Sequence, residues 1–210
     1  LDSASTGPVR EGCVGGGTGM ICHEFKGGIG TASRKVTVEQ RKYTLGVLVQ
    51  ANHGIRADLI IAGVPVGRLL LDMPSPKSSR DTTFKGAGSI LVAVATDAPL
   101  LPHQLKRIAR RVPLGISRVG SHGEQYSGDI FIAFSTANPK AAGRKGISNL
   151  EMLPNDRMDP LFHATVQATE EAVLNSLIAA QTTTGLNGTT AYAIPHDRII
   201  EIIRRYQRLA

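Results

Sequence analysis

The sequence predicts a layered α/β fold, in which helices pack against a β-sheet. Three apolar runs rich in β-branched residues are typical of buried strands, at residues 43–51, 89–96 and 127–136. Helical patterns follow at residues 102–112, 159–180 and 197–209. With 210 residues, 41% of them apolar, the chain has the length of one large domain or two small ones and can bury a real core.

The first element is unusually rich in glycine. Residues 12–30 contain eight glycines, a density that favours loop or closely approached strand over helix. The GGGTGM run lacks the Lys-Ser/Thr ending of a P-loop and the G-x-G-x-x-G spacing of a dinucleotide site. We therefore expect this backbone to approach a substrate or another subunit closely, with Gly16, Gly17 and Thr18 as candidate substrate contacts.

Short strands are expected next, at residues 57–63 and 66–71, because turn signals separate these apolar runs. Asn52 ends the preceding strand, within VQANHG. Asn-x-Gly is common in turns, so Asn52 has a plain structural interpretation. The alternative is that its side-chain amide projects from the strand end as a hydrogen-bond donor.

A Gly88–Ser89 step joins a polar stretch, residues 74–88, to the apolar run of residues 89–96. A Gly-Ser pair before a strand is common in loops. If the chain is cut at this step, however, Ser89 gains a free α-amine beside its own hydroxyl. An α-amino group has an ordinary pKa of about 7.7–8.0. Such an amine can act as the general base for the Ser89 nucleophile.

The helical segments carry most of the surplus positive charge. Pro113 is expected to stop the first helix, and Asp159-Pro160 is a good start for the second. The net charge is +7, concentrated in residues 106–111 and 204–208. Apolar residues, with Tyr206 among them, occupy the opposite faces of these helices, so the arginines are not combined with a platform of aromatic residues. We interpret the basic residues as solvated helix faces and expect no nucleic-acid partner.

A second polar cluster, Ser127-Gly128-Asp129, stands at the head of another apolar strand. An acid entering a buried strand is costly unless it is paired. Asp129 is therefore expected either to cap the turn or to orient groups and receive protons at an active site. The six histidines occur in no Ser-His-Asp signature, so a conventional catalytic triad is not supported.

The two cysteines, Cys13 and Cys22, are too few for a disulfide framework and lack metal-ligand spacing. His23 beside Cys22 completes no recognisable ligand set, so no metal or organic cofactor is expected. Both cysteines are expected to be buried small residues or free thiols. There is no run of 18 apolar residues, and therefore no membrane partner is expected.

Seven motifs resemble the L-aminopeptidase/D-Ala-esterase family, which includes the β-peptidyl aminopeptidases. They span essentially the whole chain in the expected order: EGCVGGGTGM, FKGGIGTASR, VLVQANHG, VATDAPLLPHQLKRIARR, SGDIFIAFSTAN, ATEEAVLN and AYAIPHDR. The resemblance implies a single hydrolase domain over residues 1–210, folded as a four-layer αββα sandwich. This sandwich resembles N-terminal-nucleophile hydrolases with a different connectivity.

The resemblance also implies roles for particular residues. Ser89 matches the nucleophile, which is freed by self-cleavage of the Gly88–Ser89 bond. Residues 1–88 then correspond to the C-terminal part of one subunit and residues 89–210 to the other. Asn52 matches the asparagine that donates to the oxyanion. Ser127 and Asp129 match a Ser-x-acid pair that assists proton transfer, although Asp129 is one methylene shorter than the common Glu.

The expected function is hydrolysis of short peptides, amino-acid amides or esters at the N-terminal residue. The family pattern includes a segment before the GGGTGM region, with a Glu and a Tyr that contact substrate, and we expect this chain to lack it. We expect a homo-oligomer of cleaved units, located in the cytoplasm, with the periplasm as the alternative. Two rival functions are an acyl transfer of the ornithine acetyltransferase kind and a non-enzymatic nucleotide- or nucleic-acid-binding domain. Because ornithine acetyltransferases use a Thr nucleophile, Ser89 argues against the first.

Overall fold

A four-stranded sheet forms the centre of the molecule. A computed structural model describes residues 2, 5–76, 88–143 and 145–208. The sheet has the strand order β3-β4-β5-β6. The first three strands pair antiparallel, whereas β6 runs parallel to β5. These strands are β3 (Gly28–Val38), β4 (Arg41–Asn52), β5 (Ser89–Thr96) and β6 (Ile130–Ser135).

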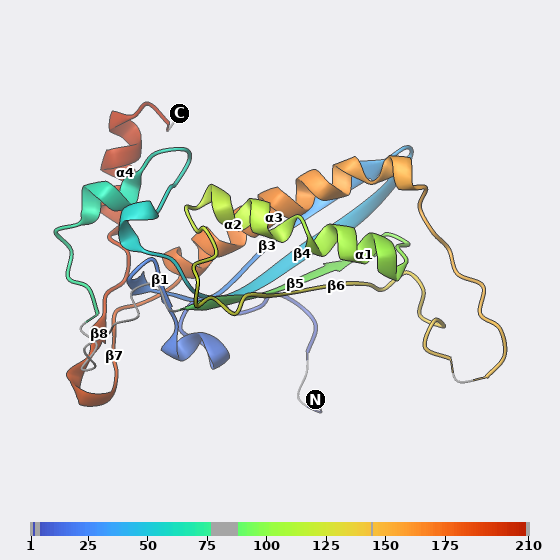
Figure 1. The fold of residues 1–210 in the computed structure, drawn as a ribbon, viewed down its shortest axis with the longest axis horizontal. Coiled ribbons are helices and arrows are strands. Elements are labelled where there is room, and N and C mark those ends of the chain that lie inside the picture. The colour runs from blue at the N-terminus through green and yellow to red at the C-terminus, as the bar shows by residue number, and fades with distance from the viewer. Residues whose placement is uncertain (1, 3–4, 77–87, 144, 209–210) are drawn as a thin grey trace.

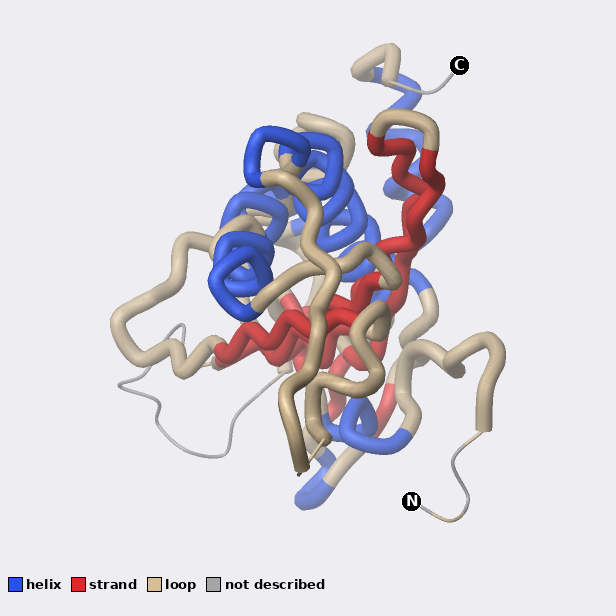
Figure 2. Tube along the Cα trace, turned by 90° about the vertical axis from the view of Figure 1, so that its right-hand side faces the viewer, coloured by secondary structure: helices blue, strands red, loops and turns tan. Residues whose placement is uncertain are grey.

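Three helices cover one face of this sheet, as Figures 1 and 2 show. They are α1 (Pro102–Ala109), α2 (Val112–Arg118) and α3 (Asp159–Ile178). The crossover from β5 to the parallel strand β6 runs through α1 and α2, because parallel neighbours cannot be joined by a tight hairpin. At one end of the sheet lie the two small sheets and the last helix: β1 (Ile21–Cys22) with β2 (Phe25–Lys26), β7 (Thr183–Thr184) with β8 (Thr190–Ala191), and α4 (His196–Arg205).

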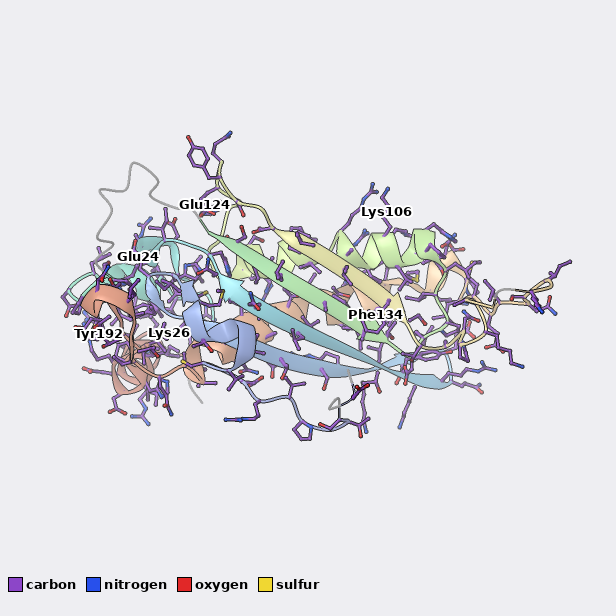
Figure 3. All side chains as sticks on the ribbon, turned by 90° about the horizontal axis from the view of Figure 1, so that it is seen from below. Glu24, Lys26, Lys106, Glu124, Phe134 and Tyr192 are labelled. Atoms are coloured by element: carbon purple, nitrogen blue, oxygen red, sulfur yellow. The ribbon has the colours of Figure 1, made fainter. Side chains whose placement is uncertain are left out.

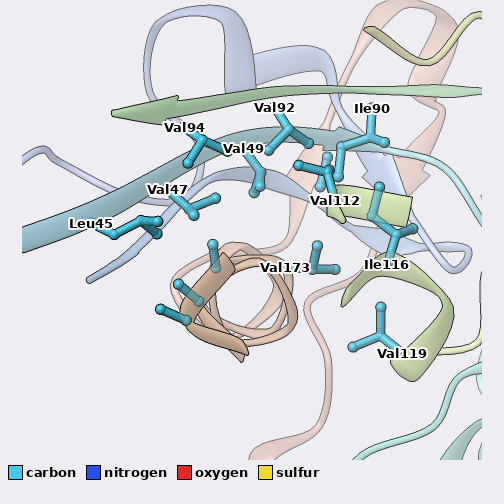
Figure 4. Packing of buried hydrophobic residues seen from close by; sticks show 14 of the residues in the cluster. Leu45, Val47, Val49, Ile90, Val92, Val94, Val112, Ile116, Val119 and Val173 are labelled. Carbon is cyan, nitrogen blue, oxygen red and sulfur yellow. The ribbon is translucent and has the colours of Figure 1, made fainter. Parts of the chain in front are cut away.

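The core lies between the sheet and the helices. Alternate residues of each strand point to this side, because successive side chains of a strand face opposite ways. Figure 4 shows strand residues of this core packed against residues of α2 and α3. The strand residues are Leu45, Val47, Val49, Ile90, Val92 and Val94, and the helix residues are Val112, Ile116 and Val173. Gly30 allows α3 to approach closely, since a Cβ at this position would lie 1.9 Å from the Ala172 carbonyl oxygen. The predicted α/β layering is confirmed.

The opposite face of the sheet is apolar and exposed. Leu91 on β5 is 43% exposed, and Ile130, Ile132 and Phe134 on β6 are 57%, 57% and 46% exposed. Figure 3 views the molecule from this side, with Phe134 labelled. Of the four layers expected for the sandwich, the described residues therefore form one helical layer and one sheet.

Two of the predicted strands are wrong. Residues 57–63 and 66–71 form the 3₁₀ turns η2 (Arg56–Asp58) and η3 (Val66–Leu70), joined by one isolated bridge between Ile61 and Val64. The segment wraps around the buried Arg56, whose guanidinium donates to the carbonyl oxygens of Glu24, Met73 and Pro74. Short apolar runs fit a buried turn as well as a strand, which is why their pattern was ambiguous.

The helix expected at residues 102–112 is α1, and a separate helix, α2, begins at Val112. The first ends at Ala109, and Pro113 lies in the first turn of α2 instead of ending a helix. The polar stretch of residues 74–88 falls largely outside the described residues, which resume at Gly88. In the described part of the chain, no helix has the length and apolar character needed to cross a membrane.

Candidate active site

Ser89 and Asn52 lie opposite each other in the sheet. Ser89 begins β5 and Asn52 ends β4, and the two residues are paired in the antiparallel register. Directly paired residues carry their side chains on the same face, with Cβ atoms roughly 4.5–5.5 Å apart. The register therefore brings together two predicted site residues that are far apart in the sequence.

The amide of Asn52 has a defined orientation. Its Oδ1 atom accepts a hydrogen bond from the backbone N–H of Ile21 at 2.9 Å. Because the oxygen is engaged in this way, the NH₂ group is the end of the side chain that can donate to a ligand. A role of Asn52 in the turn alone does not explain the hydrogen bond between its side chain and the Ile21 N–H of β1.

The hydroxyl of Ser89 is held by the backbone of the neighbouring strand. The N–H of Gly128, two residues before β6, donates to Ser89 Oγ at 2.8 Å. Sequence reasoning missed this donor, because a backbone N–H leaves no residue-type signal. The only hint is the glycine itself, since a Cβ at Gly128 would come within 3.4 Å of Ser89 Oγ.

Ser127 and Asp129 flank this contact. Asp129 Oδ1 accepts from the Ser127 hydroxyl at 2.5 Å and from the backbone N–H of Ile90 at 3.0 Å. Asp129 therefore binds the residue that directly follows Ser89 in the chain. Both expected roles of Asp129 remain compatible with this geometry, because the carboxylate ties the turn before β6 and also lies close to Ser89.

The glycine-rich run forms the 3₁₀ turn η1 (Gly15–Gly19), which packs against the protein's own strands. A Cβ at Gly16 would lie 2.0 Å from Gln50 Oε1, and one at Gly17 would lie 2.5 Å from the Gly12 carbonyl oxygen. Gln50 is two residues before Asn52 and shares its face of β4. Thr18 donates its hydroxyl to the Gly15 carbonyl at 2.8 Å. The turn stands beside the strand that carries Asn52, and its contact with substrate remains a prediction.

A buried lysine, not predicted from the sequence, holds this turn in place. The Nζ atom of Lys26 donates to the carbonyl oxygens of Gly17 at 3.0 Å, Met20 at 2.8 Å and Gly27 at 2.6 Å. Burial lowers the pKa of Lys26, although its side chain has three acceptors. Since Met20 precedes Ile21, Lys26 positions the segment that orients the Asn52 amide. Figure 3 labels Lys26 beside η1, and its backbone N–H donates to the Tyr192 carbonyl oxygen at 2.7 Å.

A cavity of about 460 Å³ opens beside Asp129. It is lined by Leu114 and Ile116 of α2, by His122 and by Phe131 of β6. Phe131 packs against the core, on the side of the sheet that the helices cover. Ser89 points to the same face of the sheet as the exposed Leu91, whereas Ile90 points to the buried face. The cavity therefore lies on the face of the sheet opposite to the Ser89 side chain.

Comparisons with known proteins identify the family and the relatives of this chain. The family model described as Peptidase family S58 matches residues 1–191. A β-peptidyl aminopeptidase, BapA, from Sphingosinicella microcystinivorans is 48% identical over 219 residues, which cover 100% of this chain and 55% of that protein. The BapA of Sphingosinicella xenopeptidilytica is 48% identical over 97% of this chain and 53% of its own length. This chain thus spans about half the length of the curated relatives it matches.

Solved structures of related aminopeptidases have the same fold as this chain. The L-aminopeptidase D-Ala-esterase/amidase of Ochrobactrum anthropi, described as a prototype serine aminopeptidase with a variant of the Ntn hydrolase fold, superposes with a TM-score of 0.90 and 48% identity. The match covers 100% of this chain and 56% of that one. A Burkholderia sp. β-aminopeptidase has a TM-score of 0.85 and 47% identity over 97% of this chain and 56% of its own. The expected fold relationship to Ntn hydrolases is confirmed.

Proposed function

Because this chain belongs to peptidase family S58, we propose that it acts as a serine aminopeptidase in which Ser89 is an N-terminal nucleophile. The observation that carries the proposal is the convergence at one edge of the sheet of the Ser89 hydroxyl, the Asn52 amide and the Gly128 N–H. These are a nucleophile, a candidate oxyanion donor and a backbone donor that fixes the nucleophile.

The proposed reaction begins with cleavage of the Gly88–Ser89 bond, which creates the α-amine of Ser89. Ser89 Oγ then attacks the substrate carbonyl carbon, and its hydroxyl proton passes to the α-amine. The tetrahedral intermediate carries a negative oxygen, to which the NH₂ group of Asn52 donates. When the intermediate collapses, the leaving amine takes the proton from the α-ammonium group and an ester on Ser89 remains.

Water completes the cycle. It attacks the ester carbonyl, gives a proton to the Ser89 α-amine, and the acid is released as Ser89 Oγ regains its hydrogen. Asp129 and Ser127, the two neighbours of Gly128 in the chain, support these proton transfers. Asp129 also accepts a hydrogen bond from the backbone N–H of Ile90. This arrangement uses the side chains of four residues and requires no metal.

The substrate class that we propose is a short peptide, amino-acid amide or ester with a free N-terminal residue. The relatives are named β-peptidyl aminopeptidase and L-aminopeptidase D-Ala-esterase/amidase, and all of these activities share one acyl-transfer chemistry. The comparisons do not favour the acetyltransferase or nucleic-acid-binding alternatives.

Intact mass spectrometry and N-terminal sequencing of the purified protein test this proposal. We expect a fragment whose first residue is Ser89, together with hydrolysis of amino-acid p-nitroanilides. Ser89→Ala should abolish both the cut and the hydrolysis, whereas Ser135→Ala, at the far end of β6, should leave the cut unchanged. A Ser89→Ala protein that is still cut at this bond would exclude self-cleavage by Ser89.

A further inference from the structure

A buried group of metal-binding residue types lies directly behind Asn52. Cys22 and His23 stand at the end of β1, and His53 follows the last residue of β4. The structure brings one ligand atom from each residue within 4.8 Å of the other two. Their exposed fractions are 0%, 0% and 3%. The expectation that His23 and Cys22 complete no ligand set took account of neighbouring positions only, and His53 comes from 30 residues later.

The ring of His23 is oriented as histidine rings are in metal sites, with one nitrogen bonded to a carbonyl oxygen. His23 Nδ1 lies 3.0 Å from the Ile55 carbonyl oxygen, so this nitrogen carries the hydrogen and Nε2 carries the lone pair. His23 Nε2 has no hydrogen-bond partner in the described residues, and the same is true of His53 Nε2. A metal-binding histidine usually donates its other ring N–H to a carbonyl or carboxylate in this way. Buried nitrogens without partners are uncommon and require an explanation.

The separations also fit a shared ion. Cys22 Sγ lies 3.9 Å from His53 Nδ1, and the ring centroids of His23 and His53 are 5.4 Å apart at an angle of 66°. Zinc–sulfur and zinc–nitrogen bonds of about 2.3 and 2.0 Å at a tetrahedral angle place the two ligand atoms about 3.6 Å apart. Two imidazoles on one such ion have centroids about 5 Å apart by the same geometry. The Cys22–His53 pair is therefore only slightly wider than in a zinc site, and every pair of ligand atoms in the group lies within 4.8 Å.

The surroundings are suited to a cation. Burial lowers the pKa of His23, and the carboxylates of Glu124, Asp58 and Glu24 oppose this shift because their negative charge attracts a cation. Glu124 Oε1 is itself buried without a hydrogen-bond partner in the described residues. Gly54, with a φ of +85°, makes room for the His23 ring, because a Cβ there would lie 2.5 Å from a ring carbon.

We propose that Cys22, His23 and His53 form a binding site for a borderline-soft divalent cation, with Zn²⁺ as the ion that fits best. A thiolate with two imidazoles suits Zn²⁺ and excludes Mg²⁺ and Ca²⁺, which prefer oxygen ligands. The ion takes no part in the acyl transfer. It ties the turn after β1 to the residue after Asn52 and so stabilises the segment that contains Ile21.

Binding releases a proton, which gives the proposal a signature of its own. A cysteine thiol has an ordinary pKa of about 8.5 and is therefore mostly protonated at neutral pH. The thiolate, and not the thiol, is the ligand, and hence each bound ion displaces one proton to the buffer.

The experiment uses the whole protein freed of metal by a chelator. Isothermal titration with Zn²⁺ in two buffers of different ionisation enthalpy should give one equivalent bound and about one proton released. Titration with Co²⁺ should produce a near-ultraviolet thiolate-to-cobalt charge-transfer band of the same stoichiometry. Absence of a bound equivalent, or binding without proton release and without that band, overturns the proposal.

Variants locate the site. Cys22→Ser should abolish the cobalt band, and His53→Gln should weaken Zn²⁺ binding by at least about 10–100-fold, the loss typical of changing even an outer partner of a metal ligand. The matched controls are Cys13→Ser, which changes the other free cysteine, and His163→Gln on the exposed face of α3. Should Cys22→Ser not fold, the His53→Gln titration decides alone: unchanged affinity in that variant rejects the site.

Discussion

The backbone N–H of Gly128 donates to Ser89 Oγ across a distance of 2.8 Å, so main chain from one strand end holds the hydroxyl at the start of its neighbour. The two strands are parallel, and their first residues therefore lie at the same edge of the sheet. The turn before β6 is itself closed by a hydrogen bond from the Ser127 N–H to the Glu124 carbonyl at 2.8 Å. The hydroxyl of the proposed nucleophile is thus held by a backbone donor that a substitution at position 128 other than proline would keep.

Asn52→Asp separates the two ends of the Asn52 amide. Aspartate keeps an oxygen for the Ile21 N–H but loses the NH₂ donor. If the NH₂ group stabilises the oxyanion, kcat should fall by about 10²–10³-fold while the melting temperature stays close to that of the wild type. Steady-state kinetics on an amino-acid p-nitroanilide, with thermal unfolding alongside, measure both quantities.

The matched control is Asn155→Asp. Asn155 Oδ1 accepts from Gln104 and Arg107, near the end of the sheet opposite Ser89, so this change also keeps an accepting oxygen. It should leave kcat unchanged. Equal activity of Asn52→Asp and wild type would contradict the assignment of Asn52 as an oxyanion donor.

Asp129→Asn tests whether the charge of Asp129 matters or only its hydrogen bonds. The asparagine oxygen can still accept from Ile90 N–H and Ser127 Oγ, so the fold should be retained. General acid–base groups contribute about 10²–10⁴-fold to rates, and we expect kcat to fall by at least the lower value. The measurement is the pH profile of kcat for the variant and the wild type.

Asp97→Asn is the control for this prediction. Asp97 Oδ1 accepts from the Thr44 N–H at 2.7 Å, just beyond the other end of β5, and thus ties backbone in the same manner without lying near Ser89. Its kcat should equal that of the wild type. A normal kcat in Asp129→Asn would make Asp129 a positioning residue alone.

Lys26→Met should destabilise the protein strongly. The change leaves the carbonyl oxygens of Gly17, Met20 and Gly27 without their shared donor. The Gly17 and Met20 oxygens each keep a backbone donor, the N–H of Met20 at 3.2 Å and that of Gly27 at 3.0 Å, whereas the Gly27 oxygen loses its lysine donor. A buried polar group left without a partner costs about 1–3 kcal/mol, and we expect a loss of about this size in the free energy of unfolding. Urea denaturation measures it, with the exposed Lys35→Met as control; equal stabilities of the two variants would show that the three contacts contribute little.

His53 should make the metal-free protein sensitive to mild acid. Burial lowers the pKa of His53 to about 3, with the nearby His23 acting in the same direction, whereas the unfolded chain takes up this proton near the ordinary value of 6.5. Stability from this group is therefore complete above pH 6.5 and is lost as the pH falls toward 3. The slope approaches about 1.4 kcal/mol per pH unit for one proton.

His53→Gln should flatten the dependence of unfolding free energy on pH between 6.5 and 4, because glutamine does not titrate. The neighbouring groups that also act on this region are Cys22, His23 and Glu124, and they are unchanged in the variant. His163→Gln on the surface of α3 should keep the wild-type slope. Identical slopes for all three proteins would show that His53 is not the group responsible.

The strands and helices of the core were predictable because their patterns are strong. The apolar run of residues 89–96 coincides with β5, and the long helix expected from Asp159 ends within two residues of its predicted end. The region around Arg56 was not predictable, since its structure depends on three carbonyl oxygens from distant loops. Local apolar pattern carries no information about such a tertiary contact.

The sequence predicts the candidate site only through the types of its side chains and their order along the chain. Ser89, Asn52, Ser127 and Asp129 were identified from motifs, and the register of β4 with β5 and the contacts of Asp129 bring them to one place. The Gly128 N–H, the Lys26 contacts and the position of His53 beside Cys22 depend on chain path alone. For that reason none of these three could be inferred from residue spacing.

The pairing of β4 with β5 has a consequence for how the protein can be assembled. Eight successive residue pairs from Leu45–Thr96 to Asn52–Ser89 join the part of the chain before Ser89 to the part after it. Neither part has a complete sheet, because β3 and β4 come from one and β5, β6 and the covering helices from the other. Cleavage of the peptide bond after Gly88 would leave these strand pairs intact. Two halves produced separately would each expose an unpaired strand edge to solvent, and such edges promote aggregation. The β4–β5 ladder can thus hold the two parts of the sheet together without the peptide bond between them.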